Sequence, residues 1–272
     1  MAEFLGTLGR MVELKCASRE STSRPDRYRL QESATGGVRA QVQPLTPRSW
    51  AIDASALADR DLAAVEGFVY GEWGPGPWHW VSVAAQHGNL LTPAESLCLE
   101  AGTSWIFRAG PMLCADGTWA GKSLSHVRPE PGWSIFWDQI PAMSGRPLTF
   151  SADVQGDGQV APQLTIGFRD ASGTFISVHT STGAASHAGP QRVSITVAAP
   201  IGAASVTVGA QGTVKALARP QVTWLGHVIP WTTGKGCRAA VVLSAGSSLI
   251  WSPGTPQRTS LSEASITIQE LT

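Results

Sequence analysis

The carboxylates are the residues that could do chemistry in this chain. Glu100, Asp116, Glu130 and Asp138 are the candidates for a pair that cleaves a glycosidic bond. Such a pair must face each other across a cleft at about 5 to 9.5 Å. The sequence does not pair these residues in space, and solvated loop charges are the simpler interpretation. We predict a protein that is not an enzyme, with weak polysaccharide cleavage as the alternative.

The other reactive residue types form no known catalytic or cofactor-binding motif. The sequence has no GxSxG, HExxH, GxxxxGK[ST] or CxxC pattern. Thr233–Cys237 (TGKGC) has a lysine among glycines but lacks the first half of a phosphate-binding loop. His79 lies between two tryptophans, which favours a packed or hydrogen-bonded loop residue over a catalytic base. We therefore predict no cofactor and no metal.

The cysteines are far apart in the chain. They are Cys16, Cys98, Cys114 and Cys237. No histidine lies at zinc-finger spacing from them. We predict four buried thiols in preference to a metal site or a disulfide framework.

Three tryptophans could bind sugar. An exposed indole can stack on the apolar face of a sugar ring, and Trp119, Trp133 and Trp137 are the candidates. In a strand-rich chain, a tryptophan is more often a core or interface residue. Contact with host cell-wall glycan is therefore the secondary interpretation of these residues.

The segment Tyr70–Trp80 (YGEWGPGPWHW) combines large aromatics with glycine and proline. Glycine and proline prevent a regular helix or strand here, so we predict a rigid turn. One interpretation is that Tyr70, Trp73, Trp78 and Trp80 contact another subunit, since aromatics are enriched in interface cores. The other is that the indoles cover the core of their own domain.

Composition restricts the partners. Twenty Lys and Arg balance twenty Asp and Glu, and charged residues make up 15% of the chain. This balance predicts no nucleic-acid partner and no attraction to anionic lipid. The amino terminus lacks the features of a secretory signal, which predicts a chain made in the cytosol. Val193–Val214 is free of acidic residues but contains Pro200 and glycines, so we predict strands there and no membrane anchor.

Alternating hydrophobicity indicates an all-β fold with one short helix. We predict a helix at about residues 58–70, because Ala58, Leu62, Val65 and Val69 fall on one face and Gly71 follows as a stop. Period-two alternation predicts strands elsewhere. These strands include Val38–Leu45, Ser49–Ser55, Leu148–Gly156, Gln163–Phe168, a strand through Phe175 and Val178, Arg192–Ala199, Ser205–Ala210 and Ser265–Leu271.

The pattern in the middle of the chain predicts a jelly-roll β-sandwich. Its short strands are separated by Gly, Pro and Ser turns, of which Asp170–Gly173 is one. We place the boundaries at about residues 88 and 226. Residues 1–88 with 226–272 then form one β-rich domain, into which residues 89–225 are inserted as the sandwich.

Several motifs resemble the minor tail proteins of long-tailed actinobacterial phages. They are KCASRESTSRPDRYRLQESATGGVRAQVQPLTPRSW, GEWGPGPWHWVSVAAQHGNLLTP, WTTGKGCRAAVVLS and SITIQEL. Such tail proteins contain jelly rolls that are like carbohydrate-binding modules. The middle of this chain is similar to these jelly rolls in the segments GRPLTFSADVQG, LTIGFRDASG, TVAAPIGAASVTVGAQG and ARPQVTW. The resemblance extends over essentially the whole chain.

The resemblance implies a structural virion protein of the tail tip, similar in role to distal tail proteins. It implies a β-rich domain that assembles with copies of itself into a hexameric or trimeric ring and contacts other tail proteins. It also implies that assembly takes place in the host cytoplasm. No catalytic residue comes with this family, and no ligand-binding tryptophan pair of a sugar-binding module is matched.

Overall fold

The fold is described by a computed structural model of the 272-residue chain. The described residues are 2–14, 17–23, 28–32, 38–42, 47–98, 113–115, 118–119, 122–123, 126–128, 135–156, 158, 161–181, 189–211, 214–251 and 261–271. The chain divides into two compact units. Unit 1 comprises Met1–Leu5, Val12–Trp80 and Arg238–Thr272, and unit 2 comprises Gly6–Met11 and Val81–Cys237. The predicted boundaries at about residues 88 and 226 both fall inside unit 2.

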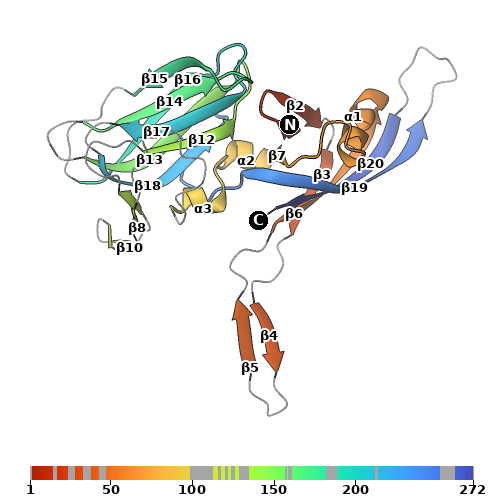
Figure 1. Cartoon of the computed structure of the whole chain (residues 1–272), viewed down its shortest axis with the longest axis horizontal. Coiled ribbons are helices and arrows are strands. Elements are labelled where there is room, and N and C mark those ends of the chain that lie inside the picture. The colour runs from red at the N-terminus through yellow and green to blue at the C-terminus, as the bar shows by residue number, and fades with distance from the viewer. Residues whose placement is uncertain are drawn as a thin grey trace. The chain divides into compact units, whose positions relative to one another are not determined.

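Unit 1 is built around a seven-stranded sheet in the order β2-β1-β7-β19-β20-β6-β3 (Figure 1). Its strands are β1 (Glu3–Thr7), β2 (Arg10–Leu14), β3 (Ala17–Ser23), β6 (Ser49–Ala58), β7 (Trp78–Val81), β19 (Cys237–Trp251) and β20 (Leu261–Glu270). β20 pairs antiparallel with both β19 and β6. Arg48 and Glu270 form an ion pair of 2.6 Å where β6 begins and β20 ends.

Helix α1 (Asp59–Val69) packs against β6 and β20. Asp59 and Asp61 lie in its first turn, where negative charge is favourable. Gly71 has φ +75° and follows the last turn, as predicted for a stop. The predicted buried stripe is wrong at its end, because Phe68 is buried and Val69 is 37% exposed. The helix buries the Phe68 face because this ring contacts the aromatic turn described below.

Strands β4 (Tyr28–Glu32) and β5 (Val38–Val42) form a two-stranded antiparallel sheet of their own, which we call the ribbon. No other strand of the described residues pairs with it (Figure 1). In its register, Tyr28 pairs with Val42 and Leu30 with Ala40, whereas Arg29 pairs with Gln41. Apolar and polar pairs therefore alternate along the ribbon, so its two faces differ in character.

Unit 2 contains a two-sheet β-sandwich (Figure 1). One sheet has the order β16-β13-β18-β11-β8, and the other has the order β12-β17-β14-β15. The first sheet comprises β8 (Leu113–Ala115), β11 (His126–Arg128), β13 (Pro147–Gly156), β16 (Gln191–Ala198) and β18 (Val214–Thr223). The second comprises β12 (Ile135–Pro141), β14 (Gln163–Arg169), β15 (Phe175–Thr180) and β17 (Ser205–Gln211). β9 (Thr118–Trp119) and β10 (Lys122–Ser123) pair with each other.

The core of the sandwich is the set of alternating residues that the sequence indicated. Leu148, Phe150, Ala152 and Val154 of β13 are buried, as are Leu164, Ile166, Phe168, Val206 and Val208 of the facing sheet. The prediction of an all-β fold with a jelly-roll-like sandwich is confirmed.

The prediction of one helix is incomplete. The described residues also form α2 (Val83–His87) and α3 (Pro93–Ser96), which are single turns that lie against β18. They are too short to show a hydrophobic period, but α3 has a capping box between Thr92 and Glu95. None of the described helices has the length and apolar character needed to span a bilayer.

Candidate assembly and binding surfaces

The aromatic turn begins with one exposed ring and ends with two buried ones. Trp78 and Trp80 are 4% and 1% exposed. The ring of Trp78 lies edge-on to Phe68 at 5.1 Å, and Trp80 lies 6.3 Å from Trp50. Both indoles therefore belong to the core of unit 1. This corrects their assignment as interface candidates, because their rings are already enclosed by their own unit.

Trp73 ties the turn to α1. Its indole N–H donates a hydrogen bond of 2.9 Å to the backbone oxygen of Ala64, and its ring lies 6.0 Å from that of Phe68. A Cβ at Gly67 would collide with this indole, so glycine provides the space for it. Trp73 is half-buried, and its role is to fix the turn on the helix.

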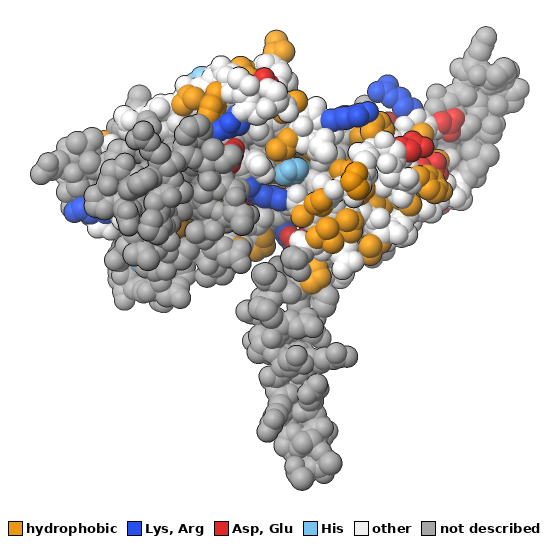
Figure 2. Space-filling model, in the orientation of Figure 1, with side chains coloured by type: hydrophobic (Ala, Val, Ile, Leu, Met, Phe, Trp, Pro, Cys, Tyr) orange, Lys and Arg blue, Asp and Glu red, His pale blue; other side chains and the backbone are white. Residues whose placement is uncertain are grey.

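Tyr70 is the predicted interface residue that the structure leaves accessible. It is 76% exposed and lies beside Val69 at the end of α1. Hydrophobic side chains gather over α1 and the neighbouring strands, with acidic side chains beside them (Figure 2). Of the four predicted interface residues, Tyr70 is thus the most exposed.

His79 lies in strand β7, not in a loop as predicted. Burial, reinforced by the positive charge of Arg238, lowers the pKa of His79 from 6.5 to about 4. The imidazole is therefore neutral at physiological pH. This environment fits the packed residue that we expected.

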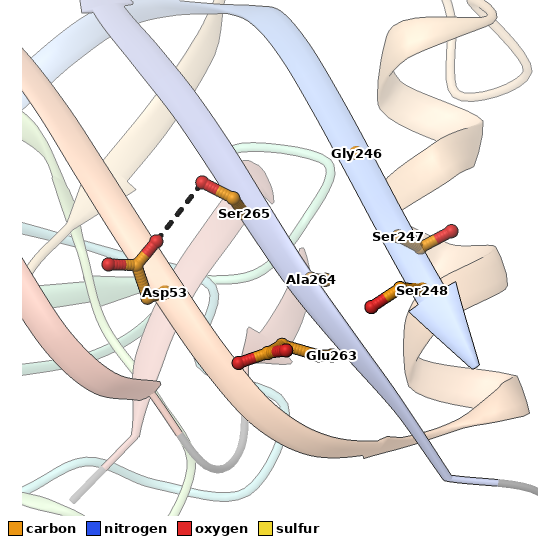
Figure 3. Close-up of a pocket in the computed structure, with 7 residues that line it drawn as sticks. All are labelled: Asp53, Gly246, Ser247, Ser248, Glu263, Ala264 and Ser265. Atoms are coloured by element: carbon orange, nitrogen blue, oxygen red, sulfur yellow. Dashed lines mark hydrogen bonds between the residues drawn. The ribbon is translucent and has the colours of Figure 1, made fainter. Parts of the chain in front are cut away.

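A hollow of about 600 Å³ lies on unit 1 over β6, β19 and β20 (Figure 3). It is lined by Asp53, Gly246, Ser247, Ser248, Glu263, Ala264 and Ser265. The side chains of Asp53 and Ser265 point toward each other and form a hydrogen bond of 3.0 Å (Figure 3). Within the described part of the chain, no three His, Cys, Asp or Glu residues are placed to hold a metal ion.

The outer face of the five-stranded sheet of the sandwich is partly covered by the chain itself. Gln221 of β18 is 1% exposed, and its amide donates hydrogen bonds to the backbone oxygens of Gly88 and Pro230. Thr149 of β13 is 2% exposed and donates a hydrogen bond to the oxygen of Leu225. The segments on either side of the sandwich strands therefore cover this face at β13 and β18, whereas β16 keeps exposed positions.

Asn89 is the centre of this covering layer. Its side-chain nitrogen donates hydrogen bonds of 3.1 Å to the oxygens of both Pro220 and Thr232. Its side-chain oxygen accepts from the N–H groups of Leu91 and Val222. All four hydrogen-bonding positions of this fully buried amide are thus satisfied.

The TGKGC segment is a clamp on the segment that begins with Asn89. Lys235 N–H donates to the oxygen of Asn89, and Gly236 N–H donates to that of Leu91, each at 2.9 Å. A Cβ at Gly234 or Gly236 would collide with the backbone oxygens of this segment. The glycines therefore allow close backbone contact, which explains the motif without a phosphate.

Five charged side chains form two networks, one on each sheet of the sandwich. Asp138 is 2% exposed, accepts a hydrogen bond of 2.5 Å from Thr207 and lies 3.7 Å from Arg169. On the other sheet, Arg192 and Arg219 both pair with Asp153. Asp138 is thus not the solvated loop charge that we expected. Its partners Arg169 and Thr207 lie 31 and 69 residues further along the chain, so no local sequence pattern predicts them.

Of the three predicted sugar-contact tryptophans, the structure describes the side chain of Trp137 alone. Trp137 is 1% exposed and lies 6.3 Å from Phe150 in the sandwich core, so it is not a sugar platform. The side chain of Trp119 and the whole of Trp133 lie outside the described residues, as do the side chains of Glu100, Asp116 and Glu130. Cys98 and Cys237 are buried free thiols, as predicted, and the side chains of Cys16 and Cys114 lie outside the description.

Comparison with known proteins gives no family. No family model matches the chain, and no curated protein matches it. Among solved structures, the enzymatically active domain of tailspike protein 4 of bacteriophage CBA120 is 9% identical, with a TM-score of 0.39. That match covers 50% of this chain and 21% of the tailspike chain, so this chain spans about a fifth of that structure.

Two further structures are similar over part of their length. A structure described as "CBM4 structure and function" is 14% identical over 36% of this chain and 69% of that chain, with a TM-score of 0.27. A disulfide-linked pilus of Bacillus endospore appendages is 15% identical over 60% of this chain and 97% of that chain, with a TM-score of 0.15. At TM-scores below 0.5, none of these similarities carries an argument about function.

Proposed function

We propose that this chain is a structural subunit of a phage tail, which assembles with copies of itself through unit 1. The proposal combines the sequence resemblance to minor tail proteins with one structural observation, the unpaired ribbon β4–β5. The copies form a closed hexameric or trimeric ring at the tail tip and contact other tail proteins. This role depends on complementary surfaces and symmetric repetition and needs no reacting group.

The ribbon supports assembly because it is incomplete by itself. A two-stranded hairpin is marginally stable in water, and stability comes from further strands or from packing against another surface. Within the described residues, no third strand pairs with the ribbon. Its register places Tyr28 opposite Val42 and Leu30 opposite Ala40, so one face of the ribbon carries apolar residue types. Packing against a second copy removes this apolar surface from water.

Light scattering on a sizing column tests the proposal. We expect the wild type to elute as a ring at about 100 μM, a concentration at which association of about −5.5 kcal/mol or stronger is populated. In the test variant, a short Gly-Ser turn replaces residues 25–45. Because the ribbon pairs with no other described strand, this variant keeps the seven-stranded sheet and elutes as a folded monomer.

The matched control is Tyr28→Phe with Val42→Ile, which keeps the apolar pair and the oligomer. A wild-type chain that is monomeric at this concentration and absent from tail fractions of infected cells would remove the proposal. An unchanged oligomer after loss of the ribbon would remove the ribbon as its cause.

A further inference from the structure

The hairpin of β14 and β15 carries an exposed aromatic ring beside a polar turn. Phe175 is 41% exposed, whereas the other aromatic side chains of unit 2 that the structure describes are buried or half-buried. The hairpin lies at the edge of the four-stranded sheet. Its position matters because the chain itself covers the five-stranded sheet at β13 and β18, as shown above.

Arg169 fixes the Phe175 ring from one side. The guanidinium carbon of Arg169 lies 3.8 Å from the ring centroid, and Nη1 donates a hydrogen bond of 2.7 Å to the oxygen of Gly173 in the turn. Nε of the same side chain donates to Thr207. The guanidinium is therefore anchored to both the sheet and the turn, and the ring stacks on an immobile group.

Gly167 provides the space beneath the ring. A Cβ at this position would come within 2.7 Å of Cε1 of Phe175. One edge of the ring therefore rests on bare backbone at Gly167, and Arg169 lies over one of its two faces. A platform that is fixed in advance loses little conformational entropy when a ligand stacks on it.

The adjoining turn offers a charged hydrogen-bond acceptor. Oδ1 of Asp170 accepts hydrogen bonds from Ser172 N–H, the Ser172 hydroxyl and Thr174 N–H, at 2.6 to 2.9 Å. Within the described residues, Oδ2 accepts none of these bonds. The Ser172 hydroxyl, followed by the Thr174 N–H, lowers the pKa of Asp170, so the carboxylate is ionised at neutral pH.

We propose that Phe175 and Asp170 form a binding site for a neutral carbohydrate on the β14–β15 hairpin. A pyranose ring has an apolar C–H face and a rim of hydroxyl groups. The apolar face stacks on Phe175, and a hydroxyl donates to Oδ2 of Asp170. The site goes beyond the proposed role in assembly, because it lies in unit 2 and does not use the ribbon.

A neutral ligand is favoured over a charged one by the local balance of charge. The positive charge of Arg169 is compensated by Asp138, which lies 3.7 Å away. Asp170 then repels an anionic sugar. A cationic ligand is the competing possibility, and the experiment must separate it from a neutral one by its salt dependence.

Calorimetric titration with soluble gluco-, manno-, galacto- and xylo-oligosaccharides tests the proposal. We expect one series to bind with a Kd below about 1 mM. Phe175→Ala should weaken that binding at least about tenfold, and Phe175→Trp should restore it. Asp170→Asn keeps the Oδ1 acceptor of the turn, so we expect weaker binding by a smaller factor without loss of fold. The affinity should not change with salt.

Ile201→Ala is the matched control, because this residue is 94% exposed in the same unit and takes no part in the site. It should bind like the wild type. Absence of binding to every series, or wild-type affinity of folded Phe175→Ala, would overturn the proposal. Affinity that falls with salt and requires a cationic sugar would do the same. The elution volume of each variant shows whether assembly is intact, so failure of this site and failure of the ring are distinguishable.

Discussion

The side-chain oxygen of Asn89 accepts a hydrogen bond of 3.0 Å from the backbone N–H of Val222, 133 residues along the chain. With its other three bonds, this amide joins the segment before the sandwich strands to the segment after them. The bonds lie in a buried environment, where an unsatisfied polar group costs more than a hydrogen bond contributes. The stability of unit 2 therefore depends on one side chain in a segment without regular secondary structure.

Replacement of Asn89 by alanine should destabilise unit 2 strongly. It leaves two backbone oxygens and two backbone N–H groups without their partner, and we expect a loss of about 3 kcal/mol. Urea unfolding followed by circular dichroism measures this loss. The exposed neighbour His87 is the control, and His87→Ala should change the stability by less than about 0.5 kcal/mol.

The TGKGC clamp predicts that a single methyl group is not tolerated at Gly236. Gly236→Ala places a Cβ against the oxygen of Leu90, so the two segments must separate and lose hydrogen bonds. We expect a loss of about 2 kcal/mol or more in thermal unfolding of unit 2. Gly189→Ala is the matched control, since a Cβ there meets nothing within 4 Å. That variant should be neutral or slightly more stable.

The aromatic turn predicts opposite outcomes for two of its rings. Trp78→Ala removes a buried indole and should cost about 3 to 5 kcal/mol of unfolding free energy. Tyr70→Ala removes a ring that is 76% exposed and should leave the stability within about 0.5 kcal/mol. If Tyr70 contacts a partner, this variant weakens self-association in light scattering. Equal stability losses in the two variants would contradict the burial described here.

His79 should make unit 1 sensitive to acid. Its folded pKa of about 4 lies below the unfolded value of 6.5, so the unfolded chain binds a proton first as the pH falls. The contribution is fully present above about pH 6.5 and is lost between pH 6.5 and 4, by up to about 3 kcal/mol. Urea unfolding at pH 7.5 and 4.5 measures this change.

His79→Gln is the control for that measurement, because it cannot titrate. It should lose much less stability between the two pH values than the wild type. The difference between the two proteins isolates His79 from the carboxylates that titrate in the same range. Parallel losses in both proteins would show that His79 is not responsible.

The sandwich strands could be predicted because their pattern is local. In β13, Leu148, Phe150, Ala152 and Val154 alternate with polar residues, and burial of one face of a sheet requires this alternation. The helix and its stop at Gly71 were readable for the same reason. Phe68 was missed because its burial depends on rings in the following turn, outside the helical period.

The surfaces could be predicted less well, because burial of a side chain depends on distant segments. The composition of Tyr70–Trp80 indicates a rigid aromatic turn but does not show which rings point inward. Asp138 looked like a loop charge, although Thr207 and Arg169 enclose it. Phe175 was expected in a strand, but its exposure follows from the position of β15 at the sheet edge.

The backbone contacts of Asn89 with Lys235 have a consequence for how such chains diversify. The strand that leads into the sandwich, β7, and the strand that leads out of it, β19, are neighbours in one sheet. The segment between β7 and β19 therefore starts and ends at two adjacent strands. Within it, the N–H groups of Lys235 and Gly236 donate hydrogen bonds to the oxygens of Asn89 and Leu91. A different module with similarly spaced ends could be exchanged at that junction while the host sheet keeps its pairing.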